Sequence, residues 1–224
     1  MEESPHRRTL LPADAEEVFA AFVAPWVPEV QPSGAQGRLS QPLRAGISRI
    51  AQHYKLSERS VEALLKLFAS EVAAFLRTEG AFTPKARIID AVAEVIDGAD
   101  VVIAHSLGSV VAYETLWKYR LEVPLLVTVG SPLAFPQGVF PRLTPAPVDG
   151  LGARPPAVGQ WSNLADHGDI VAVPAGGVGK SFTGVAEDLH DTIARVDFHR
   201  LTNYFRSRVL GEMLTRWNDS RQNA

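Results

Sequence analysis

The chain has 224 residues, and its 22 basic and 25 acidic side chains give a formal net charge of −3. This length suits one domain with a sizeable core, so we expect residues 1–224 to form a single domain. This balance of charge lacks the excess of basic residues that is typical of proteins that bind nucleic acid. The absence of cysteine excludes disulfides, thiolate zinc sites and a thiol nucleophile, and it fits a reducing compartment.

The start of the chain, Met1–Arg8, lacks the apolar core of a signal peptide. No apolar run in the sequence reaches the length that a membrane span requires. We therefore expect a cytoplasmic protein with no membrane span.

Residues 1–99 predict a helical N-terminal region, because apolar side chains recur there at helical spacing. The apolar side chains along one face of the helix expected over about 58–79 should pack in a core rather than bind lipid. The first expected helix begins at Asp14 and ends at 25–28, and a loop follows at 29–40. The second carries Leu43 to Tyr54 on one face, and the third covers about 58–79 and stops at Gly80. The fourth runs from Thr83–Pro84 to Gly98.

The pattern changes at residue 100, where a catalytic core of residues 100–224 is expected. Short apolar runs at Val101–Ala104 and Leu125–Val129 indicate strands buried in a parallel sheet, joined by a helix over Leu107–Arg120. The proline-rich stretch 132–160 is interpreted either as a substrate-shaping lid or as a proline-fixed surface loop. Further on, we expect a strand at Gln160–Leu164, a loop beginning at Ile170–Val173, and a closing amphipathic helix over Leu201–Trp217.

The segment Ala104-His105-Ser106-Leu107-Gly108-Ser109 joins the first expected strand to its helix. It has the form of a nucleophile elbow, G-x-S-x-G, with Ala104 in place of the first glycine. Such a turn exposes the serine Oγ above the sheet at a helix N-terminus, where backbone N–H groups favour negative charge. Ser106 is therefore the candidate nucleophile, and the Leu107 N–H is a candidate oxyanion donor.

A serine nucleophile needs a base, and the base histidine needs an acid. In this architecture the acid follows the serine and precedes the histidine in the chain. We choose Asp169, at the start of an apolar run, and His199, in a loop before the terminal helix. Asp166 is the alternative acid, and His190 is the reserve base.

Two further features have plainer interpretations. His105 is expected to pack near the pocket rather than to act as a base, and Ser131 to lie in a structural turn. The segment Ala175–Ser181 is similar to a phosphate-binding P-loop, but Pro174 stands where that pattern needs glycine. A glycine-rich surface loop is the preferred interpretation, with nucleotide binding as the least favoured hypothesis.

At these residues the chain resembles the α/β-hydrolase superfamily, particularly bacterial lipase-like and serine-esterase-like members. The resemblance covers about residues 100–205 and is carried by the elbow, by Val129–Leu133, by the segment from Trp161 to Ala172, and by Asp197-Phe198-His199. It implies an α/β fold with a mostly parallel sheet flanked by helices. It also implies an acyl-enzyme mechanism with Ser106 as nucleophile, His199 as general acid and base, and Asp169 as its orienting acid.

One part of that family's pattern is missing. Members normally begin with strands, one of which ends in a His-Gly loop that supplies the second oxyanion donor, and nothing like it precedes residue 100. The sheet is then incomplete with an exposed edge, which would favour a homodimer.

The leading hypothesis is a serine hydrolase acting on a small-molecule or lipid-like acyl substrate, with no cofactor and no metal. The alternative is a catalytically weak hydrolase-like module that binds a ligand or partner.

Overall fold

The computed structural model describes residues 11–27, 41–77, 84–172, 176–194 and 198–223. The expected loop at 29–40 and the residues Gly80, Thr83, Pro174 and Asp197 lie outside these ranges. The chain divides into two compact units, Met1–Phe75 and Leu76–Ala224. The expectation of a single domain stays a prediction.

The first unit is helical, as the periodicity predicts. Phe22 and Phe68 meet edge to face, with their ring centroids 4.9 Å apart, and so join the first long helix to the third. The unit contains α1 (Ala13–Val23), η1 (Ala24–Trp26), α2 (Gln41–Tyr54) and nearly all of α3 (Glu58–Leu76).

The second unit is an α/β fold in which four parallel strands form one sheet in the order β1-β2-β4-β6. These strands are β1 (Val101–His105), β2 (Val123–Val129), β4 (Val158–Asp166) and β6 (Val185–Asp191), and a small second sheet pairs β3 (Gly152–Ala153) with β5 (Phe182–Thr183). The helices are α4 (Pro84–Ile96), α5 (Leu107–Tyr119), η2 (Phe140–Arg142), α6 (Gly177–Ser181), α7 (Leu201–Phe205) and α8 (Arg208–Gln222). The predicted fold class, a mostly parallel sheet flanked by helices, is confirmed.

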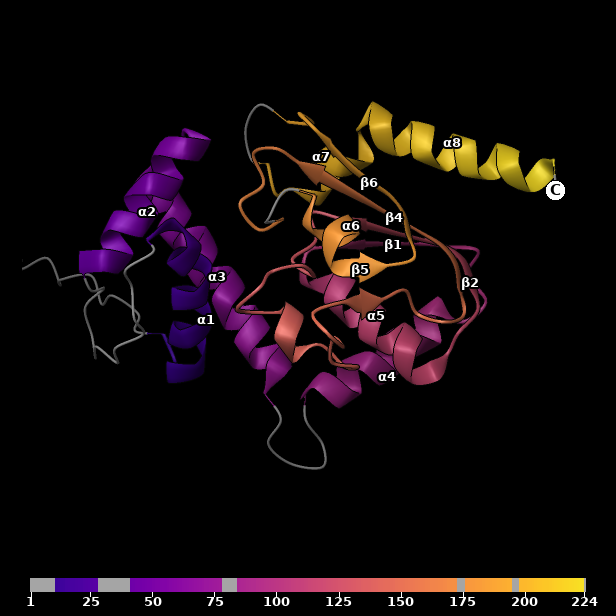
Figure 1. Cartoon of the computed structure of the whole chain (residues 1–224), viewed down its shortest axis with the longest axis horizontal. Helices are drawn as coiled ribbons and strands as arrows, with labels where there is room; N and C mark the ends of the chain where they lie inside the picture. The colour runs from indigo at the N-terminus through magenta and orange to yellow at the C-terminus, as the bar shows by residue number, and fades with distance from the viewer. Residues whose placement is uncertain (1–10, 28–40, 78–83, 173–175, 195–197, 224) are drawn as a thin grey trace, which may run out of the picture. The chain divides into compact units, whose positions relative to one another are not determined.

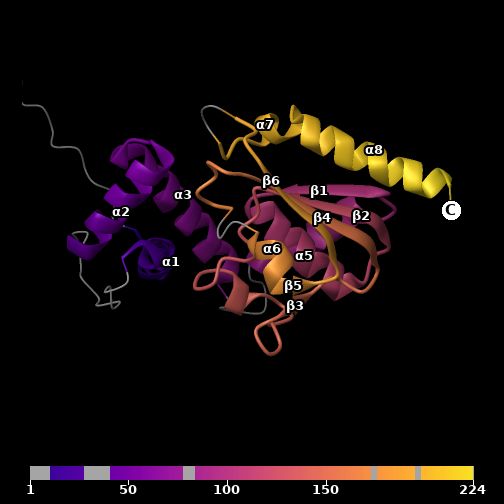
Figure 2. The same ribbon diagram turned by 45° about the horizontal axis from the view of Figure 1, so that its top comes forward.

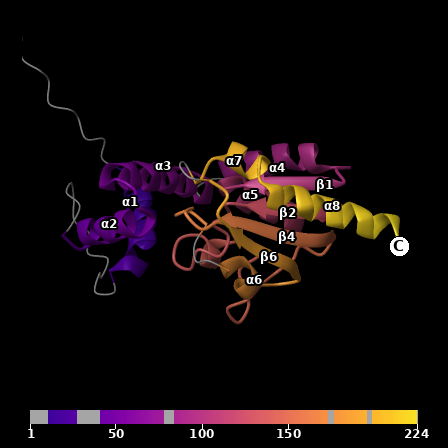
Figure 3. The same cartoon turned by 90° about the horizontal axis from the view of Figure 1, so that it is seen from above.

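The two faces of the sheet are covered by different helices, α5 on one side and α8 on the other (Figure 2). Figure 3 looks onto the α8 face, where the strands lie in order from β1 to β6. On that face Leu210 and Met213 of α8 pack with alternate residues of β2, including Val127. On the opposite face Tyr113 of α5 contacts the buried ring of Trp161. This alternation explains the apolar runs by which the strands are recognised.

Two elements differ from the sequence-based expectation. The single closing helix predicted over Leu201–Trp217 is wrong, because the chain breaks into α7 and α8 at Ser207, which has extended dihedral angles and accepts the Val209 N–H at its side chain. Strand β6 was not expected, because its sequence is rich in charged residues. As an outer strand, β6 pairs only with β4 among the described strands, so its side chains need not be apolar.

Strand β1 lies at the other edge of the sheet and pairs only with β2 among the described strands. Most of its residues are partly exposed, whereas those of β2 are almost all buried. The sheet edge formed by β1 therefore lies beside the elbow. A homodimer formed through it stays a prediction.

Candidate active site

The candidate residues lie at the carboxyl ends of the four parallel strands. The register aligns the last residue of β1, His105, with Val129 of β2, and Val129 with Leu164 of β4. The segments that leave these strands therefore meet along one edge of the sheet, which is where open α/β sheets place their ligands. Ser106 follows β1, Asp169 follows β4, and His199 follows β6.

Ser106 occupies the sharp turn between β1 and α5 that the elbow motif predicts. Its dihedral angles, φ 53° and ψ −134°, lie in a region that side chains other than glycine rarely adopt. A relay of hydroxyl groups holds this turn in place. Ser109 donates a hydrogen bond of 2.6 Å to the Ser106 carbonyl, and its Oγ lies 2.7 Å from the Oγ of Ser131. Ser131 in turn accepts the Leu133 N–H.

Because the Ser109 hydroxyl proton is already donated to the Ser106 carbonyl, the hydroxyl of Ser131 must donate to Ser109 Oγ. This order gives Ser131 the structural part that the sequence suggested. It also makes Ser109 a support of the elbow, a part that the sequence alone does not indicate.

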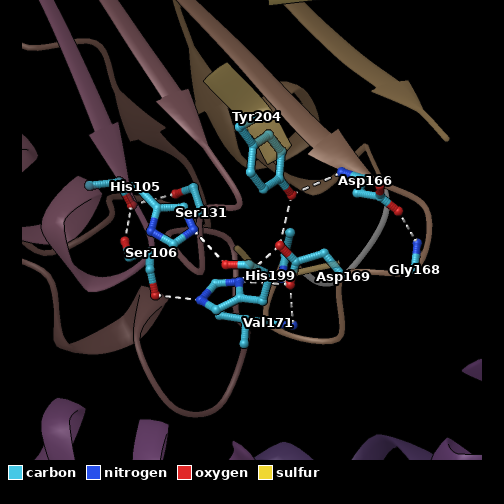
Figure 4. A network of polar contacts seen from close by, with 11 residues as sticks. His105, Ser106, Ser131, Asp166, Gly168, Asp169, Val171, His199 and Tyr204 are labelled. Carbon is cyan, nitrogen blue, oxygen red and sulfur yellow. Dashed lines mark hydrogen bonds and ion pairs between the residues drawn. The ribbon is translucent and has the colours of Figure 1, made fainter. Parts of the chain in front are cut away.

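The three residues predicted as a triad form one continuous chain of hydrogen bonds (Figure 4). His199 Nε2 lies 2.8 Å from Ser106 Oγ, and His199 Nδ1 lies 2.9 Å from both carboxylate oxygens of Asp169. A carboxylate only accepts hydrogen bonds, so Nδ1 carries the proton and Nε2 is left free to accept from the serine hydroxyl. This is the tautomer that a general base requires.

The Asp169 side chain is fully buried, at 0% exposure, yet both of its oxygens have protein donors. Oδ1 accepts the backbone N–H groups of Val171 and Ala172, and Oδ2 accepts the Tyr204 hydroxyl at 2.7 Å. Tyr204 also accepts the Asp166 N–H, so it lies between the two aspartates (Figure 4). Burial and then the charge of Asp169 raise the pKa of Tyr204 above its ordinary value. Tyr204 therefore remains a neutral donor that stabilises the carboxylate.

Asp166, the alternative acid, binds backbone rather than histidine in the contacts that the structure gives it. Oδ1 accepts the Gly168 N–H, and Oδ2 accepts the N–H groups of Ile193 and Ala194. These bonds tie the turn after β4 to the segment that leads toward His199. The geometry therefore favours Asp169 as the partner of the base and makes Asp166 an anchor.

A close backbone approach at Gly130 was not foreseen. Gly130 follows β2 with φ +56°, and a Cβ placed there would lie 2.8 Å from Asp169 Oδ2 and 3.1 Å from the Tyr204 ring. Only glycine fits both the dihedral angle and the space. The Gly130-Ser131 pair in the sequence hints at a turn but not at a contact with an acid 39 residues away.

Within the glycine-rich segment resembling a P-loop, Gly177–Ser181 form the short helix α6, and two backbone donors of the segment are engaged by the protein itself. Gly179 donates its N–H to Asp188 Oδ2, and Gly176 donates to His190 Nε2, each at 2.7 Å. Burial alone would raise the pKa of Asp188, but hydrogen bonds that include those from Asn163 and the Gly179 N–H outweigh it and lower that pKa. Asp188 is thus an anion that would repel a phosphate, and His190 lies in this network.

The Leu107 N–H, proposed as an oxyanion donor, belongs to the first residue of α5, directly after Ser106. The helix dipole adds partial positive charge at this end. A Cβ built on the neighbouring Gly108 would meet no atom within 4 Å, so the turn is open at this point. The described residues show no His-Gly loop ahead of β1.

No protein-family model matches this chain, and neither a curated protein nor a solved structure shows significant similarity to it. Within the described ranges, no helix is long and apolar enough to cross a membrane. The same ranges contain no group of three or more His, Cys, Asp or Glu side chains that could hold a metal ion.

Proposed function

We propose that the protein is a serine hydrolase of the lipase-like and esterase-like part of the α/β-hydrolase superfamily, and that it cleaves a carboxylic ester or related acyl substrate. The observation that carries this proposal is the unbroken chain from Ser106 Oγ through His199 to the buried Asp169. The three residues lie in segments that follow three different strands. Their alignment supports catalysis because a serine hydroxyl needs a base and an orienting acid in this order.

The proposed reaction begins when His199 Nε2 takes the proton from Ser106 Oγ as that oxygen attacks the acyl carbon. The carbonyl oxygen becomes an oxyanion, which the Leu107 N–H stabilises. The tetrahedral intermediate collapses to acyl-Ser106, and His199 donates its proton to the leaving alcohol oxygen. Water then attacks the acyl group with His199 as base, which releases the acid and restores the serine.

Asp169 stays ionised through both steps. Its hydrogen bond to Nδ1 fixes the tautomer of His199 and stabilises the imidazolium that forms in each half of the reaction. The donors from Tyr204 and the Val171 N–H replace the water that the buried carboxylate has lost.

Hydrolysis of p-nitrophenyl butyrate tests the proposal. We expect turnover by the wild type, and we expect Ser106→Ala to remove it without lowering thermal stability. Ser220→Ala, on the exposed face of α8, is the matched control and should keep full activity. A folded wild type that binds such esters without turnover would instead favour the binding-module alternative, and activity that survives in Ser106→Ala would refute the role of that serine.

A further inference from the structure

The residue before the nucleophile, His105, makes a direct contact with the backbone of the proposed base. Its Nε2 lies 2.9 Å from the carbonyl oxygen of His199, 94 positions away in the chain. The two imidazole rings also pack together, with centroids 4.7 Å apart, and the ring of Tyr204 lies 5.8 Å from that of His105. Figure 4 shows His105 reaching from the end of β1 toward His199.

The strand places His105 for this contact. In the register of the sheet His105 is paired with Val129, and its side chain projects to the α8 face, opposite to that of Ala104. The segment that carries His199 and α7 lies on that same face. A residue one position away in β1 would point to the other side of the sheet.

The protonation state of His105 follows from its partner. A carbonyl oxygen only accepts hydrogen bonds, so Nε2 must carry a proton. Burial and then the nearby His199 lower the pKa of His105 to about 4, so the ring is neutral at pH 7. A neutral neighbour matters because a second positive charge would oppose the imidazolium that His199 forms during the proposed reaction.

His199 needs such a hold because it lies in neither a strand nor a helix. It is followed by α7, a helix of five residues whose N-cap side chain makes no capping hydrogen bond. Upstream, Asp166 fixes the backbone at Ile193 and Ala194. The contact from His105 fixes the backbone at His199 itself. A displacement of about 1 Å at a reacting group can cost about 10²-fold in rate.

We infer that His105 is a positioning residue whose Nε2–H holds the backbone of His199, so that the imidazole stays within hydrogen-bond reach of Ser106. The inference rests on the proposed function, and it gives the histidine of the elbow a part separate from proton transfer. His105 touches neither the substrate nor the reacting atoms and acts through His199.

A pair of polar variants tests the inference. The amide of Gln in His105→Gln reaches roughly the place of the imidazole Nε2, whereas the amide of Asn in His105→Asn reaches only that of Nδ1. We expect His105→Asn to lower kcat for p-nitrophenyl butyrate by about 10- to 100-fold, with KM changed less than about 2-fold. His105→Gln should recover most of the loss. His167→Leu, on an exposed histidine of the same unit, should keep wild-type rates.

A second readout does not depend on turnover. Hydrogen–deuterium exchange at residues 198–200 should be faster in His105→Asn than in the wild type and should return toward the wild-type rate in His105→Gln. If His105→Asn does not fold, His105→Leu gives the same comparison. Equal rates and equal exchange in the Asn and Gln variants would overturn the inference. An inactive wild type with the expected exchange pattern would instead refute the proposed hydrolase and leave the positioning role of His105 standing.

Discussion

The elbow at Ser106 and the glycine-rich segment at Gly176–Ser181 both place a tight turn before a helix, but their polar groups are used differently. At the elbow, the Ser106 hydroxyl faces His199, whose other ring nitrogen contacts Asp169, and the turn is open at Gly108. In the glycine-rich segment, the backbone donors of Gly176 and Gly179 are engaged by His190 and Asp188. A motif can bind or react with another molecule only where the fold leaves its polar groups available.

The largest contrast is expected between the aspartates that serve the two turns. Asp169→Asn should lower kcat by about 10⁴-fold, because an amide cannot fix the His199 tautomer as the carboxylate does. Asp188→Asn should keep kcat within about 3-fold of wild type, because Asp188 holds the glycine-rich segment and not the base. Ester hydrolysis at pH 7 measures both. An equal loss of kcat in the two variants would contradict the difference in function proposed for the two turns.

A smaller contrast is expected between two glycines, each of which lies against one of these aspartates. A Cβ at Gly130 would lie 2.8 Å from Asp169 Oδ2, and a Cβ at Gly179 would lie 2.9 Å from the Cβ of Asp188. Both Gly→Ala variants should lose about 1–3 kcal/mol of unfolding free energy in urea. Only Gly130→Ala should also lose activity, by about 10²-fold, because it displaces the acid of the triad. An active Gly130→Ala variant would show that the contact with Asp169 has no catalytic consequence.

The smallest effect concerns backbone strain. Ser106 has φ 53° and ψ −134°, whereas the residue before α6 is a glycine, Gly176, at φ 65° and ψ 18°. Ser106→Gly should therefore raise the unfolding free energy by about 1 kcal/mol even though it removes the proposed nucleophile, and Gly176→Ser should lower it by a similar amount. Urea denaturation of the two variants measures both changes. A Ser106→Gly variant less stable than wild type would mean that the elbow stores no strain.

The sequence predicts those elements whose side chains are almost all in one environment, such as the buried core. The run at β2 is almost wholly buried between two helical layers, so its apolar composition is unambiguous. Strand β6 and the break at Ser207 escaped prediction, because an outer strand tolerates charges and because a single serine cap gives little signal within an amphipathic pattern.

The residues of the candidate site also divide into those that the sequence predicts and those that it does not. Ser106, Asp169 and His199 could be proposed because the chemistry of an activated serine demands those residue types in that order. Their supports could not be proposed. The contacts of Gly130 with Asp169, of Tyr204 with the same carboxylate, and of His105 with the His199 carbonyl all join residues far apart in the chain. The parallel sheet and the segments that follow its strands bring them together.

We propose that His199 and Asp169 activate Ser106. Intact mass after incubation with a fluorophosphonate, which forms a stable adduct only with an activated serine, is the direct test of this activation. We predict a single adduct on the wild type that is absent from both Ser106→Ala and His199→Ala. A folded wild type that gains no adduct, or a Ser106→Ala variant that still gains one, would contradict it.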